Sequence, residues 1–375
     1  MPVPLLDLTR QYAAIRDEVE AVVLAVCRSG KYILGETVER LEKELAGYCG
    51  AGAAVGVSSG SDALLLALMD RGVGPGDEVV TTPFSFFATA GAIVRLGAKP
   101  VFADIDPDSF NINENAALSV MTERTKAVII VHLFGRWSSS DRLIAQCEKR
   151  GIALIEDAAQ AIGCENSRGR RAGSVGHYGA FSFFPSKNLG AFGDGGVLTV
   201  RDEETAERLR VLRNHGMKPA YLHHLVGGNF RLDALQAAIL SVKLRRLESW
   251  HAGRRANAEK YRAAFDEAGV PPDKVKLPTP GKGRHIYNQF TLRCADRDGL
   301  MKHLQARGIG CAIYYPLGLH LQPCFASLGH REGDFPETER ACREVLSIPI
   351  FPELTANEQL EVARAIAEFY RGSGV

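Results

Sequence analysis

The chain has 375 residues, of which 46% are hydrophobic and 24% are charged, and its formal net charge at pH 7 is +1. This composition is typical of a globular protein with a sizeable core, divided into one large domain and one smaller one. The near-neutral charge argues against nucleic acid as the main partner, because a surface that follows phosphates usually carries a basic excess.

The cysteines and the N-terminal segment indicate the compartment. The eight cysteines are scattered and none forms a C-x-x-C pair, so neither a disulfide framework nor a structural zinc site is expected. The segment MPVPLLDLTRQYAAIRDEVE lacks a basic region followed by an apolar one. No apolar run approaches the ~18 residues of a membrane span. We therefore expect a cytoplasmic protein without a membrane contact.

Residues 1–250 are expected to form the large domain. It begins with a helical segment, and from about residue 37 short apolar runs alternate with helical patterns. The predicted strands are 53–59, 77–83, 99–105, 127–135, 152–158, 179–185 and 195–200. This alternation predicts an α/β fold with a mostly parallel central sheet flanked by helices. In such sheets, ligands bind beyond the carboxyl ends of the strands.

Residues 251–375 are expected to form a small α+β domain. The pattern changes after about residue 250, where a helix leads into a Pro- and Gly-rich connector, VPPDKVKLPTPGKG. The elements predicted there are a helix at 257–269, strands at 285–294 and 309–316, and helices at 297–308 and 356–372.

The first motif with chemical meaning is SSGSDALLLAL, from Ser58 to Leu68. A strand ends here, and Ser61 opens an amphipathic helix after the tight turn that Gly60 allows. The free N–H groups and the positive end of such a helix bind phosphate, although Ser61 could simply cap the helix. The segment is not a P-loop, because the G-K-[ST] ending is absent.

The second motif, LIEDAAQAIG, places two acids at the end of an apolar strand. Glu156 and Asp157 must point to opposite faces, so one of them can face the ligand crevice. A carboxylate there needs a partner to stay charged, and a cationic ring nitrogen would be one. A helix-capping carboxylate is the alternative.

The third motif is FSFFPSKNLGAFGDGG, which contains Lys187. An amine beside an apolar wall near the strand ends would have its pKa lowered and become nucleophilic, as Schiff-base chemistry requires. Ser182 lies on the strand leading in and could reach a nearby phosphate. A surface lysine, the alternative, fits poorly between a proline and a Gly-rich run. A phosphate cradle, a carboxylate and an activated amine together meet the demands of pyridoxal 5′-phosphate.

Over nearly its whole length the chain resembles the DegT/DnrJ/EryC1/StrS family of nucleotide-sugar aminotransferases, which are fold-type I pyridoxal phosphate enzymes. The segments that carry the resemblance are LDLTRQY, SSGSDALLLAL, SFFATA, VHLFG, EDAAQAIG, FSFFPSKNLGAFGDGG, GGNFRLDALQAAIL, YYPLGLHLQP and LSIPIFPEL.

The resemblance implies a role for each residue around the cofactor. Lys187 would form the Schiff base, Asp157 would pair with the pyridine nitrogen, and Gln160 would contact the phenolic oxygen or its neighbourhood. Phe86 would stack on the ring face, with Phe87 as the alternative. The phosphate would be held by Gly60, Ser61 and Ser182.

The resemblance also implies a homodimer with shared active sites, because Asn229 would reach the cofactor phosphate of the neighbouring subunit. Arg231 would recognise a substrate carboxylate or phosphate, or form a salt bridge at the dimer interface. The residues expected to line the nucleotide-sugar entrance are Tyr314, Tyr315 and His320. No metal site is expected, because the adjacent His223 and His224 lack acidic partners nearby.

The implied reaction is a ping-pong transamination. L-Glutamate would give its amino group to the cofactor and leave as 2-oxoglutarate, and a nucleotide-linked keto-sugar would then receive the amine. The resemblance of NFRLDALQAAIL favours a 3-keto hexose, dTDP- or UDP-linked and with or without a 2-acetamido group. A 4-keto-6-deoxy sugar is the alternative. Lipopolysaccharide or lipid A synthesis is one expected destination. A non-catalytic regulatory protein is a rival of another class, without charge or helix-turn-helix support.

Overall fold

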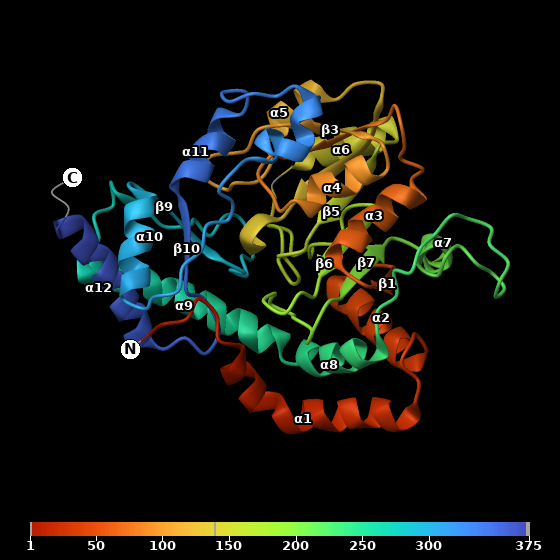
Figure 1. The fold of residues 1–375 in the computed structure, drawn as a ribbon, viewed down its shortest axis with the longest axis horizontal. Helices are drawn as coiled ribbons and strands as arrows, with labels where there is room; N and C mark the ends of the chain where they lie inside the picture. The colour runs from red at the N-terminus through yellow and green to blue at the C-terminus, as the bar shows by residue number, and fades with distance from the viewer. Residues whose placement is uncertain (1, 139, 373–375) are drawn as a thin grey trace.

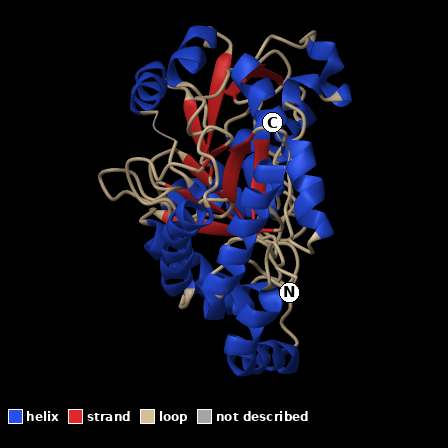
Figure 2. Ribbon diagram, turned by 90° about the vertical axis from the view of Figure 1, so that its left-hand side faces the viewer, coloured by secondary structure: helices blue, strands red, loops and turns tan. Residues whose placement is uncertain are grey.

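The structure is a computed structural model that describes residues 2–138 and 140–372. A central sheet lies between helices on both of its faces (Figures 1 and 2). In the described residues this sheet has seven strands, in the order β1-β7-β6-β5-β4-β2-β3. They are β1 (Ala53–Val57), β2 (Glu78–Thr81), β3 (Lys99–Phe102), β4 (Thr125–Val131), β5 (Ala153–Asp157), β6 (Tyr178–Ser182) and β7 (Gly196–Val200).

The predicted mostly parallel sheet is confirmed. β3, β2, β4, β5 and β6 run parallel to one another, and β7 is antiparallel to both of its neighbours. In this register Val131 of β4 lies beside Asp157 of β5, which lies beside Ala180 of β6. The carboxyl ends of these three strands therefore meet at one edge of the sheet.

The helices within residues 8–244 pack around the sheet because its central strands are apolar on both faces. Every residue of β1, β2, β5 and β7 is buried. These helices are α1 (Leu8–Ser29), α2 (Glu36–Cys49), α3 (Gly60–Asp70), α4 (Ala88–Arg95), α5 (Glu114–Val120), α6 (Asp141–Arg150), α7 (Glu203–Arg213) and α8 (Ala234–Leu244), with a short 3-10 turn η1 (Leu133–Gly135). In Figure 1, α1 lies along α8 at the bottom of the molecule.

The smaller part of the chain is α+β, as predicted. Its antiparallel sheet has the order β10-β9-β8. Its elements are β8 (Val275–Lys276), β9 (Phe290–Cys294), α10 (Arg297–Ala306), η2 (Leu319–Leu321), η3 (Pro323–Leu328), α11 (Pro336–Glu344), β10 (Val345–Ile348) and α12 (Ala356–Gly372). The helix α9 (Leu247–Ala268) runs without a break through the proposed boundary after residue 250.

The strand predicted at 309–316 is wrong. In this segment Ile309 and Ala312 each make only an isolated bridge, the first to Val3 and the second to Ser347. The ladder position beside β9 is taken by Val345–Ile348, which pairs residue by residue with it. Of the strand predicted at 285–294, only the second half is extended into β9.

None of the described helices is both long enough and apolar enough to cross a membrane.

Candidate active site

The predicted phosphate residues meet where α3 begins. Ser59 caps this helix, because its hydroxyl accepts a hydrogen bond of 3.1 Å from the Asp62 N–H. A Cβ atom added to Gly60 would lie 2.7 Å from Cβ of Ser182 at the end of β6. Only glycine therefore lets the helix terminus approach β6 this closely, and Ser61 follows in the first turn of the helix.

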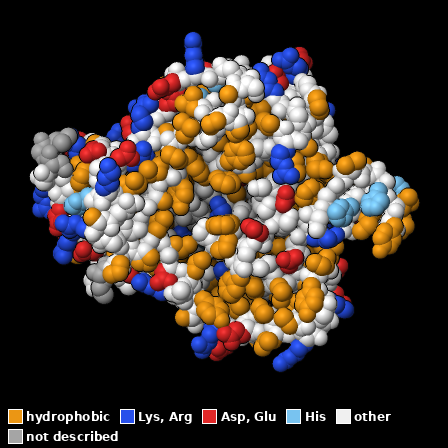
Figure 3. Space-filling view, viewed as in Figure 1, with side chains coloured by type: hydrophobic (Ala, Val, Ile, Leu, Met, Phe, Trp, Pro, Cys, Tyr) orange, Lys and Arg blue, Asp and Glu red, His pale blue; other side chains and the backbone are white. Residues whose placement is uncertain are grey.

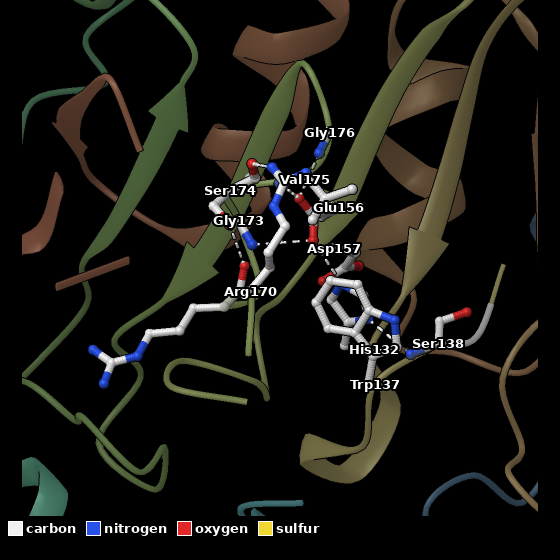
Figure 4. Close-up of polar contacts among 12 residues, drawn as sticks. His132, Trp137, Ser138, Glu156, Asp157, Arg170, Gly173, Ser174, Val175 and Gly176 are labelled. Carbon is white, nitrogen blue, oxygen red and sulfur yellow. Dashed lines mark hydrogen bonds and ion pairs between the residues drawn. The ribbon is translucent and has the colours of Figure 1, made fainter. Parts of the chain in front are cut away.

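Glu156 and Asp157 point to opposite faces of the sheet, as the strand alternation predicts. Glu156 is fully enclosed by donors (Figure 4). Its carboxylate accepts hydrogen bonds of 2.7–3.0 Å from three backbone N–H groups, of Gly173, Val175 and Gly176. A fourth contact, of 2.8 Å, comes from Nε2 of His132. These donors hold the pKa of Glu156 below its usual range although burial acts to raise it. Glu156 therefore has a structural environment.

Asp157 has fewer partners than Glu156. Its Oδ2 accepts a hydrogen bond of 2.8 Å from the Thr89 hydroxyl, and its Oδ1 accepts one of 3.2 Å from the Ala159 N–H. Burial raises the pKa of Asp157, while these donors and the charge of Lys187 oppose the rise. A buried carboxylate in this state gains from a cationic hydrogen-bond donor.

Lys187 lies in a tight turn just beyond β6. The turn closes so that a Cβ on Gly190 would lie 2.2 Å from the Pro185 carbonyl oxygen. Burial lowers the pKa of Lys187 to about 8, and the negative charge of Asp157 opposes this shift. The amine and the carboxylate are thus close enough to influence each other, and a substantial fraction of the amine is neutral near pH 8.

Gln160 and Tyr315 join the two parts of the chain at the site. The Gln160 side chain accepts a hydrogen bond of 2.7 Å from the Phe134 N–H and donates one of 3.3 Å to the Tyr315 hydroxyl. Burial, with the nearby charge of Asp157, raises the pKa of Tyr315. Tyr315, predicted for the substrate entrance, therefore lies beside the residues predicted for the cofactor.

The two neighbouring phenylalanines have different environments. The Phe87 ring stacks on Phe325 at a centroid distance of 5.5 Å and an interplanar angle of 11°. The Phe86 ring is 59% exposed and lies 6.4 Å from the ring of Tyr315. Phe87 is also 46% exposed, so its stacking on Phe325, rather than exposure, is what distinguishes it from Phe86.

Asn229 and Arg231 lie next to the end of β1. Asn229 is exposed and its backbone forms a bridge with Asn214. Arg231 forms a bridge with Val57 and donates a hydrogen bond of 2.7 Å to Oδ1 of Asn214. Within the part of the chain that is described, its Nε is buried without a hydrogen-bond partner. The predicted roles of both residues stay predictions.

The remaining predicted substrate residues are not grouped together. Tyr314 packs with Tyr315 at a ring distance of 6.0 Å. His320 is buried in another cluster, where its Nε2 lies 3.1 Å from Oε1 of Glu339 and its ring packs against Phe335. The structure thus adds no direct support for a contact between His320 and a substrate.

Sequence reasoning missed Thr89 and His132. Thr89 is part of SFFATA, in which only the aromatic residues suggested a contact with a ligand. It lies on α4, far in sequence from Asp157, so its hydrogen bond to that carboxylate has no local sequence signal. His132 is sandwiched between Glu156 and Trp137, whose ring lies 4.5 Å from its own (Figure 4). Its Nδ1 accepts a hydrogen bond of 3.0 Å from the Ser138 N–H. Among the residues described, no three histidine, cysteine or acidic side chains cluster as a metal site would require.

The residues present fit pyridoxal phosphate. The close approach of Gly60 and Ser182 forms a cradle that a Cβ atom would fill. Asp157 is influenced by the charges of Lys187 and His132 but its hydrogen bonds, within the described residues, come from uncharged donors. Lys187 offers an amine of lowered pKa. This arrangement defines a pyridoxal phosphate enzyme of fold type I.

Comparison with known proteins gives the family. The model of the DegT/DnrJ/EryC1/StrS aminotransferase family matches residues 13–367. The chain is 50% identical over 372 residues to the pleiotropic regulatory protein of Geobacillus stearothermophilus, with 99% of each chain covered. It is 41% identical over 367 residues to the dTDP-3-amino-3,4,6-trideoxy-alpha-D-glucose transaminase of Streptomyces venezuelae, covering 98% of this chain and 96% of the relative.

A solved structure agrees with these matches. The X-ray structure of S. venezuelae DesV in complex with a ketimine intermediate superposes with a TM-score of 0.94 at 41% identity, covering 98% of both chains. The chain belongs to the DegT/DnrJ/EryC1/StrS aminotransferase family. It is a transaminase, and its cofactor is pyridoxal 5′-phosphate.

Proposed function

We propose that this transaminase moves an amino group from L-glutamate to a nucleotide-linked 3-keto hexose. The observation that carries the chemistry is that Lys187, whose amine has a pKa of about 8, lies close enough to Asp157 at the carboxyl edge of the sheet for their charges to influence each other. The sugar is supported by similarity, since relatives named for 3-amino or 3-oxo sugars carry either dTDP or UDP. A 2-acetamido group at the neighbouring carbon is compatible with the UDP-linked examples.

The residues of the site divide the work. Pyridoxal phosphate, when bound, supplies an aldehyde that takes up the amino group and a ring that accepts electrons from the adjacent carbon. Lys187 Nζ, with its lowered pKa, can hold the cofactor and later move a proton. Asp157 would hold a proton on the ring nitrogen of the cofactor. Gln160 would contact the phenolic oxygen of the ring or its neighbourhood. Phe86 would cover the ring face.

The phosphate and substrate contacts follow from position. Gly60, Ser61 and Ser182 would bind the cofactor phosphate at the start of α3. Arg231 would bind an anionic group of the substrate, because its buried Nε has no partner in the described chain. Tyr314 and Tyr315 would line the sugar side of the ring.

We propose that the enzyme is a homodimer in which Asn229 completes the active site of the neighbouring subunit. The loop after α7 projects from the body of the molecule, and apolar and histidine side chains cover it (Figures 1 and 3). Its Tyr221 and Val226 are 92% and 91% exposed. Large apolar side chains are also exposed near the lysine turn, at Phe184 and Phe192. Such exposure favours burial by a second chain.

A complementation experiment tests shared sites. Lys187→Ala and Asn229→Ala homodimers should each be nearly inactive. Mixing the two under conditions that exchange subunits should restore activity, because one site of each hybrid is then intact. A mixture that stays inactive while native mass spectrometry of differently tagged subunits shows hybrid dimers would contradict sharing.

The substrate is tested with purified keto-sugars. The enzyme is offered dTDP- and UDP-linked 3-keto hexoses and the dTDP-4-keto-6-deoxy hexose, each with L-glutamate, and 2-oxoglutarate and amino-sugar are quantified. We expect the highest kcat/KM with a 3-keto sugar. Faster turnover of the 4-keto sugar would replace the proposal by its alternative.

A regulatory role is the second candidate, and the name of the G. stearothermophilus relative favours it. The enzyme takes precedence because the chain retains Lys187 in a turn that lowers its pKa. If Lys187→Ala reproduced every phenotype of a gene deletion, regulation would depend on catalysis. If the variant behaved as wild type in the cell, a separate regulatory function would be indicated.

A further inference from the structure

A short chain of hydroxyl groups ends on the Asp157 carboxylate. The hydroxyls of Ser85 and Thr89 lie 2.8 Å apart, and the Thr89 hydroxyl lies 2.8 Å from Oδ2 of Asp157. Both side chains are buried, with Ser85 4% and Thr89 0% exposed. Because both hydroxyls are buried away from bulk water, they must hydrogen-bond to each other or to another protein group.

The direction of these hydrogen bonds follows from proton counting. An ionised carboxylate only accepts, so the single proton of the Thr89 hydroxyl must point at Asp157. The Thr89 oxygen is then left as an acceptor, and the Ser85 hydroxyl must donate to it. The chain therefore runs from Ser85 through Thr89 to Asp157, and it favours the charged carboxylate.

The same turn also sets the position of Phe86. Thr89, in the first turn of α4, donates its backbone N–H to the Phe86 carbonyl at 3.2 Å. Ser85 lies four residues earlier, just before this helix. One turn of chain thus carries both the Phe86 ring and the hydroxyl that donates to the Asp157 carboxylate. The charges of Lys187 and of His132, whose ring binds Glu156, also favour the ionised form of Asp157, and the Asp157 charge in turn acts on the Tyr315 hydroxyl.

We propose that Thr89, oriented by Ser85, is a positioning residue that keeps Asp157 ionised and thereby keeps the ring nitrogen of the cofactor protonated. This inference rests on the proposed role of Asp157. Without the Thr89 hydroxyl the carboxylate becomes more basic, and the proton it shares with the ring nitrogen moves toward Asp157. The ring then accepts electrons less well.

The experiment uses the holoenzyme loaded with pyridoxal phosphate that carries ¹⁵N in the ring. Thr89→Val removes the hydroxyl and keeps the shape, Thr89→Ser restores it, and Thr81→Val is the control. Thr81 is also fully buried, but its hydroxyl donates to the Ile129 carbonyl at 3.0 Å. In Thr89→Val the ¹⁵N resonance should move toward the neutral-ring position, and the cofactor dissociation constant should rise about tenfold.

The outcomes separate this inference from the proposed function. Thr89→Ser and Thr81→Val should keep the wild-type resonance. An unchanged resonance in Asp157→Asn would overturn the role of Asp157 itself. If the resonance changes in Asp157→Asn but not in Thr89→Val, only the role of Thr89 is overturned. Equal changes in Thr89→Val and Thr81→Val would also overturn the role of Thr89. Should Thr89→Val not fold, Ser85→Ala decides: a smaller shift in the same direction supports the chain, and no shift overturns it.

Discussion

Two lysines of this molecule have the same lowered pKa, about 8, in very different surroundings. Lys187 lies beyond β6, partly exposed, where the charge of Asp157 acts against desolvation. Lys243 lies in α8 and is 2% exposed, and its Nζ donates a hydrogen bond of 2.5 Å to the Gly190 carbonyl. Its Nζ also lies 5.4 Å from the Phe192 ring centroid.

The difference between these lysines shows that a lowered pKa does not by itself define a reactive amine. Desolvation lowers both values. Only Lys187 combines a partly neutral amine with exposure to a ligand and a nearby carboxylate, that of Asp157. Lys243 instead binds Gly190, three residues after Lys187, so it supports the turn that carries the reactive amine.

The sharpest test replaces each amine in turn. Lys187→Ala should lower turnover by at least about a thousandfold and abolish the visible band of the bound cofactor, because the attachment point and the proton carrier are both lost. Lys243→Met should keep the band. Absorbance spectra and borohydride trapping followed by peptide mass spectrometry check both. Trapping of the cofactor on Lys243 would reverse the assignment.

The next test concerns the carboxylate that distinguishes the two surroundings. Asp157→Asn should lower kcat/KM by about a hundredfold, because an amide cannot stabilise a protonated ring nitrogen as a carboxylate does. Glu156→Gln is the matched control on the same strand. It should lower the free energy of unfolding instead, by about 1–3 kcal/mol, because it disturbs a buried and fully paired carboxylate. Steady-state kinetics and urea unfolding on both variants check the pair. A larger kinetic loss in Glu156→Gln would contradict this division.

The convergence of the site could be predicted from the sequence because it follows from a general rule. Neighbouring parallel strands end at one edge of a sheet, so Asp157 after β5 and Lys187 after β6 were expected to lie near each other. Gly60 reaches the same edge because the antiparallel β7 between β1 and β6 leaves those two strands pointing the same way. The alternation of strand side chains also predicted that Glu156 and Asp157 face opposite ways. The structure shows which of the two is left with few partners.

The remaining features could not be predicted because they depend on contacts between distant segments. Nothing local to SFFATA says that Thr89 reaches Asp157, and nothing in YYPLGLHLQP says that Tyr315 binds Gln160. The predicted strand at 309–316 failed for the same reason. Its apolar pattern suits a strand, but the position beside β9 is taken by Val345–Ile348.

The supporting role of Lys243 predicts a loss of stability with little loss of chemistry. Lys243→Met leaves the buried Gly190 carbonyl without its donor and should lower the free energy of unfolding by about 1–3 kcal/mol. Lys302→Met, on the exposed surface of α10, is the control and should change it by less than about 0.5 kcal/mol. Chemical unfolding monitored by circular dichroism measures both. Equal effects would show that the hydrogen bond to Gly190 contributes nothing.

The smallest expected effect is the pH dependence of labelling in the cofactor-free protein. An amine reacts in its neutral form, so the modification of Lys187 by a brief pulse of acetic anhydride should rise as the pH passes through about 8. Between pH 7 and pH 9 the gain should be roughly tenfold, whereas an ordinary exposed lysine of pKa ~10.4 would gain about a hundredfold. Lys243 has the same lowered pKa but is almost wholly enclosed, so it should stay unlabelled at both pH values until the protein unfolds. Peptide mass spectrometry quantifies each site. A hundredfold gain at Lys187 would mean that the turn leaves its amine fully hydrated, and labelling of folded Lys243 would mean that access does not separate the two lysines.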